Sequence, residues 1–439
     1  MAAVPFRHPG FVVNPGSPFK NDKVGREAFV RELCRRVMAQ EQAAVVAITG
    51  GFGSGKSVAL QMCASVLRAD GATVTEFNAW QQSYTRDPLI DLVSALSKEQ
   101  SEVWKRVAEI ALRLASPVVS SLTGGLVRLD SVVDGKTAPE SDPFAGWATT
   151  DQHVGDFKEA LATVVTDTRG RFVVLIDELD RCVPEYAMDL LNVARHLFDV
   201  PGVVIVLGVN RAELGHRVRQ IYGDKCDADT YLRRFVDLPI DLPIPESQER
   251  DGYTRGLLAS AEPTQHADFL AAALDLLIGE ARISLRDAEQ ILRRVAQLIP
   301  DARQSRSYWY LGTVAMLVLR EVDRKAYEAF AAGRIDAFEA VAALRASLPA
   351  TLVAQSKRAS TVQDVEDLLL LMGDERERSA ARLTSENFQE RWVDVDLGDP
   401  ASAEATFSRL MHQPVSAWEF QARDIAAQIE SVVSARPAR

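Results

Sequence analysis

The hydrophobic positions of the N-terminal half alternate between helical spacing and short apolar runs. Phe29, Leu33 and Val37 lie about one turn apart, which predicts a helix over Val24–Met38. Uninterrupted β-branched runs follow, and such runs are typical of strands buried in a parallel sheet. The expected strands are Ala43–Thr49, Ala72–Phe77, Phe172–Ile176, Val203–Gly208 and Phe235–Leu242, the last placed at a sheet edge by Pro239.

Helical segments lie between these runs. Lys56–Arg68 follows the first strand, and Tyr186–Phe198 lies between the third and the fourth. Strands that alternate with helices predict an α/β fold with a parallel sheet of about five strands. After Pro245 the composition changes to Ala, Leu and Arg at helical spacing, as in the apolar positions Leu285, Ala288, Leu292, Val295 and Ile299.

A long stretch without a strand pattern separates the second strand from the third. Pro88–Leu114 is mostly helical in spacing, and Gly135–Gly146 is loop-like, so 81–170 is interpreted as an insertion. We therefore expect a lead-in at 1–22 and an α/β domain at 23–245. A helical domain at 246–345 and a helical C-terminal region at 346–439 complete the expected organisation.

A phosphate-binding loop follows the first strand. The segment fits G-x-x-x-x-G-K-[ST] and consists of Gly50, Gly51, Phe52, Gly53, Ser54, Gly55, Lys56 and Ser57. Glycines let successive backbone N–H groups point at phosphate oxygens, Lys56 adds a charge on the outer phosphates, and Ser57 offers a hydroxyl to Mg²⁺. The alternative is a structural glycine turn, but a strand before the loop and a helix after it favour nucleotide binding.

Two acidic residues, Asp177 and Glu178, end the third strand. A carboxylate in this position completes the Mg²⁺ shell of P-loop enzymes, which is the role expected for Asp177. Glu178 would orient and activate the attacking water. The alternative is an acidic strand end that caps a helix, as Asp180 could.

Asn210 ends the fourth strand and is a candidate to bind the attacking water or the terminal phosphate. The alternative is a turn-forming Asn before a helix, which is common. Asn210-Arg-Ala-Glu213 also resembles the guanine-reading N-K-x-D motif weakly, with Arg in place of Lys and Glu in place of Asp. We therefore favour ATP over GTP.

Composition and charge narrow the function classes. The chain has 47% hydrophobic and 25% charged residues and a net charge of −11, which is ordinary for a globular protein but disfavours a role dominated by nucleic-acid binding. Cys34, Cys63, Cys182 and Cys226 are scattered, as in reduced cytosolic proteins. The longest apolar stretches, Leu114–Val127 and Tyr308–Leu319, are too short to span a bilayer. A cytoplasmic location and no membrane span are expected.

These residues together resemble the KAP family of P-loop NTPases, related to AAA+ and STAND proteins. Besides the phosphate loop, the resemblance depends on three segments within about residues 18–300. They are Asp22-Lys-Val-Gly-Arg26, Glu76-Phe-Asn-Ala-Trp80 and Val174-Leu-Ile-Asp-Glu-Leu-Asp-Arg-Cys182. Tyr231-Leu-Arg-Arg234 with Leu242-Pro243 resembles a later family segment, in which Arg234 replaces Lys. Many members have Asp where Asn210 and Glu178 stand.

The resemblance implies an ATP-hydrolysing molecular switch that uses Mg²⁺, forms a homo-oligomer and acts on a protein partner or effector. It also implies a lid-like role for 246–345 and an arginine that reaches a neighbouring subunit's nucleotide. Arg234, before the fifth strand, is the preferred candidate and Arg233 the second. Arg286, or alternatively Arg282, would reach the phosphates from the helical domain. The alternative for Arg233 and Arg234 is a solvated helix face, and a surface salt bridge explains Arg286 or Arg282 equally well.

Three functions remain as hypotheses. The first is the ATPase switch, with a possible defence role against phage that the family resemblance alone implies. The second is a nucleotide-dependent scaffold with little turnover. The third is a DNA-handling ATPase, which depends on the basic run Arg282–Arg306 and is disfavoured by the net charge.

Overall fold

The structure is a computed structural model. It describes residues 13–96, 107–111, 143–167, 171–259, 267–280, 282–298, 307–349, 357–372, 385–413 and 422–434. The chain divides after Pro243 into two compact units, each described here by itself.

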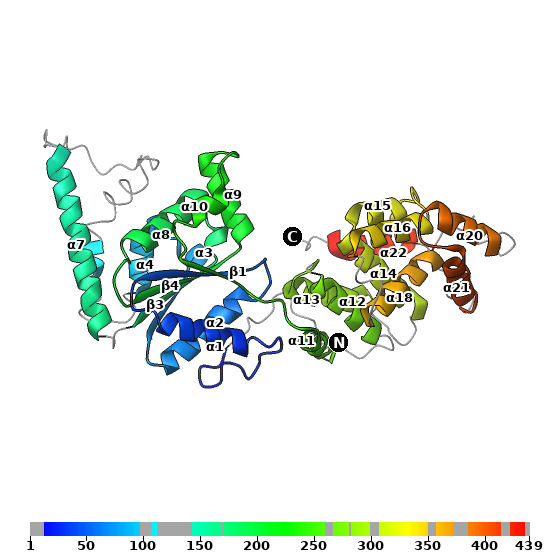
Figure 1. The fold of residues 1–439 in the computed structure, drawn as a ribbon, viewed down its shortest axis with the longest axis horizontal. Helices are drawn as coiled ribbons and strands as arrows, with labels where there is room; N and C mark the ends of the chain where they lie inside the picture. The colour runs from blue at the N-terminus through cyan, green and yellow to red at the C-terminus, as the bar shows by residue number, and fades with distance from the viewer. Residues whose placement is uncertain are drawn as a thin grey trace. The chain divides into compact units, whose positions relative to one another are not determined.

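The N-terminal unit contains one parallel sheet of five strands in the order β2-β3-β4-β1-β5 (Figure 1). The strands are β1 (Ala44–Thr49), β2 (Thr73–Asn78), β3 (Phe172–Asp177), β4 (Val203–Val209) and β5 (Leu238–Asp241). The predicted α/β fold is therefore confirmed. β5, which contains Pro239, lies at the sheet edge beside β1, as the missing N–H of proline predicts.

Helices cover both faces of the sheet, and alternate strand residues point into two separate cores. α1 (Glu27–Met38) and α2 (Lys56–Ala69) pack on the face that contains Val46, Ile48 and Val206. The opposite face is covered by α4 (Pro88–Leu96), α7 (Pro143–Asp167), α8 (Pro184–His196) and α9 (Arg211–Tyr222). Short elements occur at the strand ends: α3 (Ala79–Gln82), the 3₁₀-helix η1 (Leu179–Arg181) and α10 (Ala228–Leu232).

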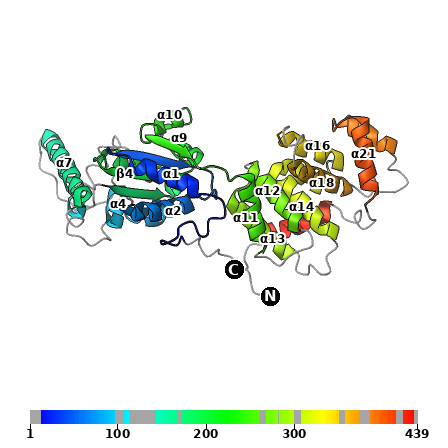
Figure 2. The same cartoon turned by 60° about the horizontal axis from the view of Figure 1, so that its bottom comes forward.

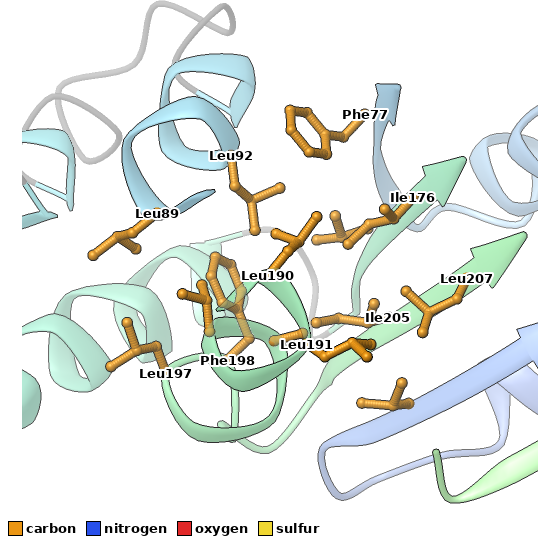
Figure 3. Packing of buried hydrophobic residues seen from close by; sticks show 14 of the residues in the cluster. Phe77, Leu89, Leu92, Ile176, Leu190, Leu191, Leu197, Phe198, Ile205 and Leu207 are labelled. Atoms are coloured by element: carbon orange, nitrogen blue, oxygen red, sulfur yellow. The ribbon is translucent and has the colours of Figure 1, made fainter. Parts of the chain in front are cut away.

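The second core shows how the insertion is attached to the sheet. Figure 3 shows Leu92 of α4 and Leu190 of α8 near the side chains of β2 and β3, among them Phe77 and Ile176, whereas Leu89 of α4 lies farther from the strands. All are buried, and each such side chain contributes roughly 1.5–3 kcal/mol through removal of apolar surface from water. α4, which belongs to the expected insertion, is therefore part of the core on this face of the sheet.

One expectation within the insertion is wrong. The loop predicted over Gly135–Gly146 does not extend to residue 146, because α7 begins at Pro143. Proline is well suited to the first turn of a helix, where its missing N–H would have no intrahelical partner. Pro143 therefore begins the helix. The rest of that predicted loop lies outside the described residues.

The C-terminal unit is helical throughout its described residues. Figure 2 shows α14 (Ser307–Val322) among α11 (Ser247–Ala259), α12 (Ala267–Gly279), α13 (Leu285–Leu298), α16 (Ala337–Ser347) and α18 (Lys357–Leu371). The remaining helices are α15 (Arg324–Ala331), α20 (Ser385–Asp394), α21 (Pro400–Met411) and α22 (Ala422–Ser434). The expected boundary between a helical domain at 246–345 and a C-terminal region at 346–439 falls within α16. This division stays a prediction.

The apolar stretch Tyr308–Leu319 lies within α14, where Val314, Met316 and Val318 are buried among other helices of the unit. Leu114–Val127 lies outside the described residues. Across the described ranges, no helix combines the length and apolar character needed to cross a membrane. Cys34, Cys63, Cys182 and Cys226 are all free thiols.

The carboxyl group of Asp189 on α8 is buried. Its burial predicts that the stability of the folded protein depends on pH. Burial, together with the nearby carboxylates of Asp87 and Glu185, raises the pKa of Asp189 to about 7. Because this folded-state pKa exceeds the unfolded value of about 3.9, the ionised form is disfavoured in the folded protein. The carboxyl therefore lowers stability progressively as the pH rises from about 4 to 7.

We expect Asp189→Asn to raise the Tm at pH 8 by several degrees, at about 2–4 °C per kcal/mol, and to raise it less at pH 5. Thermal unfolding followed by circular dichroism at the two pH values measures this difference. Asp224→Asn, at an exposed position, is the matched control and should leave the Tm unchanged. An equal gain for Asp189→Asn at both pH values would contradict the assignment.

Candidate functional site

The phosphate-loop sequence forms a tight turn between β1 and α2. Gly53 and Gly55 have φ values of 73° and 98°, in the left-handed region that favours glycine. Gly50 is required by space instead, because a Cβ there would lie 2.8 Å from Ser54 Oγ. The local sequence therefore determines the path of the backbone at the amino end of α2, where N–H groups and the helix dipole favour an anion.

Lys56 lies within this turn. Its Nζ donates hydrogen bonds to the carbonyl oxygens of Gly50, at 2.8 Å, and Gly51, at 2.9 Å. The residue is only 8% exposed, and the ring of Phe52 lies 5.8 Å from Nζ. The ammonium group is thus oriented by the loop itself, at the position where the motif predicts phosphate contact.

Asp177 lies at the end of β3, and β4 separates β3 from β1, the strand before the phosphate loop. The Asp177 carboxylate nevertheless lies near the Ser57 side chain. Burial raises the pKa of Asp177, while the Ser57 hydroxyl and the positive charge of Lys56 act in the opposite direction. The two residues predicted to hold Mg²⁺ are therefore close together.

Gly208 leaves room for the Asp177 carboxylate. It pairs in register with Asp177 across β3 and β4. A Cβ at Gly208 would lie 3.1 Å from Asp177 Oδ1 and 2.6 Å from Leu60 Cδ1. Only glycine leaves room for both the carboxylate and the α2 side chain.

Glu178 has a left-handed backbone, with φ 59° and ψ 26°, which is uncommon for a residue with a side chain. Asn78 Nδ2 donates to Glu178 Oε2 at 3.1 Å, and Arg181 Nη1 lies 3.0 Å from Oε1. Both oxygens of the predicted base therefore contact other side chains of the same unit. The motif segments Glu76–Trp80 and Val174–Cys182 contain both partners, but spacing alone did not indicate these contacts.

Arg181 also lies between two aromatic rings. Its Cζ is 5.9 Å from the ring centroid of Phe52 and 5.5 Å from that of Trp80. These rings are 44% and 53% exposed. The stack connects the phosphate loop to the carboxyl ends of β2 and β3, and cation–π attraction stabilises it.

Asn210 caps α9. Its Oδ1 accepts hydrogen bonds from the backbone N–H groups of Ala212 and Glu213, at 3.1 and 3.5 Å. Its backbone N–H favours the ionised form of the Asp180 carboxyl, whose pKa is raised by burial. The cap occupies the side-chain oxygen, so a contact with water or phosphate would use the amide nitrogen Nδ2.

The arginines predicted to complete the site are in two different units. Arg233 and Arg234 are exposed after α10. Arg286 lies in the first turn of α13 in the C-terminal unit, and the Arg282 guanidinium donates to the carbonyl of Ser347. The structure brings together the phosphate loop, Asp177, Glu178 and Asn210. The roles of Arg234 and Arg286 stay predictions, and residues 299–306 of the basic run lie outside the described chain.

The residues present suit Mg²⁺. In the described part of the chain, no three His, Cys, Asp or Glu side chains gather in a way that would hold a metal ion alone. Mg²⁺ typically takes one or two protein oxygen ligands together with substrate phosphates and waters. The adjacent Ser57 hydroxyl and desolvated Asp177 carboxylate fit this donor set.

The sequence model of the KAP family P-loop domain matches residues 26–295. The match covers more than half of the chain, from Arg26 at the start of α1 into α13. It includes the phosphate loop, Asp177, Glu178, Asn210, Arg234 and Arg286.

Comparison with solved structures finds low-similarity matches. The ORC2 protein of Aeropyrum pernix, in ADPNP and ADP complexes, is 13% identical, with 94% of each chain covered and a TM-score of 0.36. The FIGL-1 AAA domain in complex with ADP is 16% identical, with 71% of this chain and 88% of that chain covered and a TM-score of 0.35. A search of curated proteins found no match.

The space around Gly208 gives a stability prediction. Gly208→Ala places a methyl group against Leu60 and Asp177, and overpacking of this kind costs about 1–3 kcal/mol. We expect the urea midpoint of unfolding to fall. Gly215→Ala on α9 is the matched control, because its Cβ would meet Ala228 Cβ at an ordinary 3.5 Å and alanine favours a helix. A Gly208→Ala midpoint equal to that of the wild type would contradict the close approach.

Proposed function

The chain belongs to the KAP family of P-loop domains, and on that premise we propose that it binds ATP together with Mg²⁺ and hydrolyses the nucleotide. The observation that carries this proposal is the Lys56 ammonium held by the carbonyls of the phosphate loop, with the buried Asp177 carboxylate near Lys56 and Ser57. A structural glycine turn would not require a buried carboxylate from a strand that is not adjacent to β1. An ATPase site requires the phosphate-binding loop and also this carboxylate.

Substrate binding follows from the phosphate loop. Backbone N–H groups of the loop and the amino end of α2 would hold the phosphates, and Lys56 would exchange its carbonyl partners for phosphate oxygens. Ser57 and Asp177 would hold Mg²⁺, which neutralises charge on the phosphates when it is bound. Asn210 Nδ2 would donate to the attacking water or to the terminal phosphate.

Glu178 would act as the base that orients and deprotonates the attacking water. In the structure one of its oxygens accepts a hydrogen bond from Asn78 and the other contacts Arg181, and each oxygen keeps a further lone pair that could accept a proton from water. Hydrolysis in a switch would also depend on a further event.

We assign that further event to a second copy of the chain. Lys56 provides a cation on one side of the phosphates, and charge that builds on the transferring phosphoryl group requires another. Arg234, exposed after α10, would supply it to a neighbouring subunit, and Arg286 would act from the C-terminal unit. A protein effector and a role against phage, which the family resemblance implies, stay predictions. Nucleic-acid handling is the weaker hypothesis because the net charge is −11.

Binding and turnover should respond to different substitutions. Lys56→Ala removes a charged contact to the phosphates and should weaken ATP binding about 10–100-fold. Glu178→Gln keeps the shape of the side chain but loses the base, so ATP should bind normally while turnover falls about 10²–10⁴-fold. Equilibrium titration of a fluorescent ATP analogue and phosphate release measure the two effects. Glu178→Gln with wild-type turnover would show that another group is the base.

Hydrolysis should need a second subunit. Specific activity should rise with protein concentration, and Arg234→Ala should bind ATP normally but lose about 10³–10⁵ in rate, the usual value of an arginine finger. Mixing Arg234→Ala with Lys56→Ala should restore activity, because some interfaces then join an intact nucleotide site to an intact arginine. Arg233→Ala is the matched control and should hydrolyse at the wild-type rate. Activity that is independent of concentration, with no restoration on mixing, would contradict this assignment.

A further inference from the structure

Three aromatic side chains form a ladder beside Arg234. Tyr222 ends α9, Tyr231 lies in α10, and Phe235 follows α10. The ring centroids of Tyr222 and Tyr231 are 4.7 Å apart, and those of Tyr231 and Phe235 are 5.4 Å apart. Tilted rings at these separations attract one another. Tyr231 is therefore held from both sides.

The ladder is anchored at its inner end. Phe235 is 6% exposed and belongs to the core between the sheet and α8, whereas Tyr222 is 42% exposed. The hydroxyl groups of Tyr222 and Tyr231 share a hydrogen bond of 2.7 Å. Burial and this hydrogen bond raise the pKa of Tyr231.

Tyr231 contacts Arg234 through both its ring and its backbone. The Arg234 guanidinium carbon lies 5.7 Å from the Tyr231 ring centroid, within the range of cation–π attraction. The Arg234 N–H also donates to the Tyr231 carbonyl at 3.2 Å. The N–H of the adjacent Arg233 donates instead to the carbonyl of Asp229, on the preceding turn. Arg234 therefore contacts the ladder through its guanidinium group and through its backbone.

We propose that Tyr231 is a positioning residue for Arg234, whose ring orients the guanidinium toward the triphosphate bound to a second copy of the chain. This inference rests on the proposed function of Arg234. An exposed arginine samples many side-chain rotamers, and a group that stabilises a transition state is effective only when its geometry is prepared beforehand. The Tyr231 ring is fixed by Tyr222 and Phe235. It would therefore hold the exposed Arg234 guanidinium in one orientation before the nucleotide site of the second copy meets it.

The mixed-subunit assay tests the proposal because the two subunits have different tasks. In a mixture of Lys56→Ala and Arg234→Ala chains, only the Lys56→Ala chain supplies the arginine and only the Arg234→Ala chain supplies the nucleotide site. Tyr231→Leu is added to one chain or to the other, and phosphate release is measured at the same total concentration. A positioning role matters only in the chain that supplies the arginine.

We expect Tyr231→Leu in the Lys56→Ala chain to reduce the restored activity roughly 10–100-fold, the cost of a misplaced catalytic group. The same substitution in the Arg234→Ala chain should leave the restored activity unchanged. Tyr231→Phe, which keeps the ring but loses the hydroxyl, should preserve most of the activity in either chain. ATP titration of the Arg234→Ala/Tyr231→Leu chain should give the affinity of Arg234→Ala.

Three results would overturn the proposal. Equal losses in the two placements would mean that Tyr231 supports folding or assembly rather than Arg234. Full activity in both placements would mean that the ring does not affect the guanidinium. Absence of any restoration in the original mixture would remove the second-subunit role of Arg234, and the proposal for Tyr231 with it. The first two results leave the proposed function intact, so the two failures are distinguishable.

Discussion

The carboxyl edge of the parallel sheet carries charged groups that its apolar core cannot solvate, and the candidate site is organised by how these charges are satisfied. Lys56 and Asp180 are buried, and burial raises the pKa of Asp177 and of Asp180. A buried charge is costly unless it has a partner. The loop carbonyls accept hydrogen bonds from Lys56, and the Ser57 hydroxyl and the Asn210 backbone favour the ionised forms of Asp177 and Asp180. Folding of the sheet therefore assembles these groups.

The sequence predicts the local parts of this arrangement well. Continuous apolar runs identify strands that are covered on both faces, and Pro239 identifies the edge strand. The glycines of the phosphate loop determine its conformation through left-handed φ values at Gly53 and Gly55. Each of these features depends on a few consecutive residues, so the chemistry of those residues is sufficient to predict it. Pro143 is the exception, because proline is compatible with both a loop and the first turn of a helix.

The contacts that restrain the site could not be predicted, because they depend on strand order. Asn78 and Glu178 are 100 residues apart and meet only because β2 lies beside β3. The position of Arg181 between Phe52 and Trp80 requires the turns after β1, β2 and β3 to converge. Gly208 has no motif of its own, and the need for glycine becomes evident only when Asp177 and Leu60 are placed around it. Tyr231 and Arg234 are close in sequence, but the ring that orients the arginine is fixed by Tyr222 and Phe235.

Phosphate binding and turnover consequently depend on different kinds of contact. The groups that would hold the phosphates belong to one continuous segment, Gly50–Ser57, whose shape is determined by its own glycines and by Lys56. The groups that would act on the water and on the developing charge are held by distant side chains, Glu178 by Asn78 and Arg181, and Arg234 by Tyr231. Asn78 and Arg181 orient the Glu178 carboxylate and leave it lone pairs for a water, whereas Arg234 is exposed and would act only on a nucleotide bound to another copy of the chain. With such a division, a bound nucleotide would persist until a second copy presents the arginine.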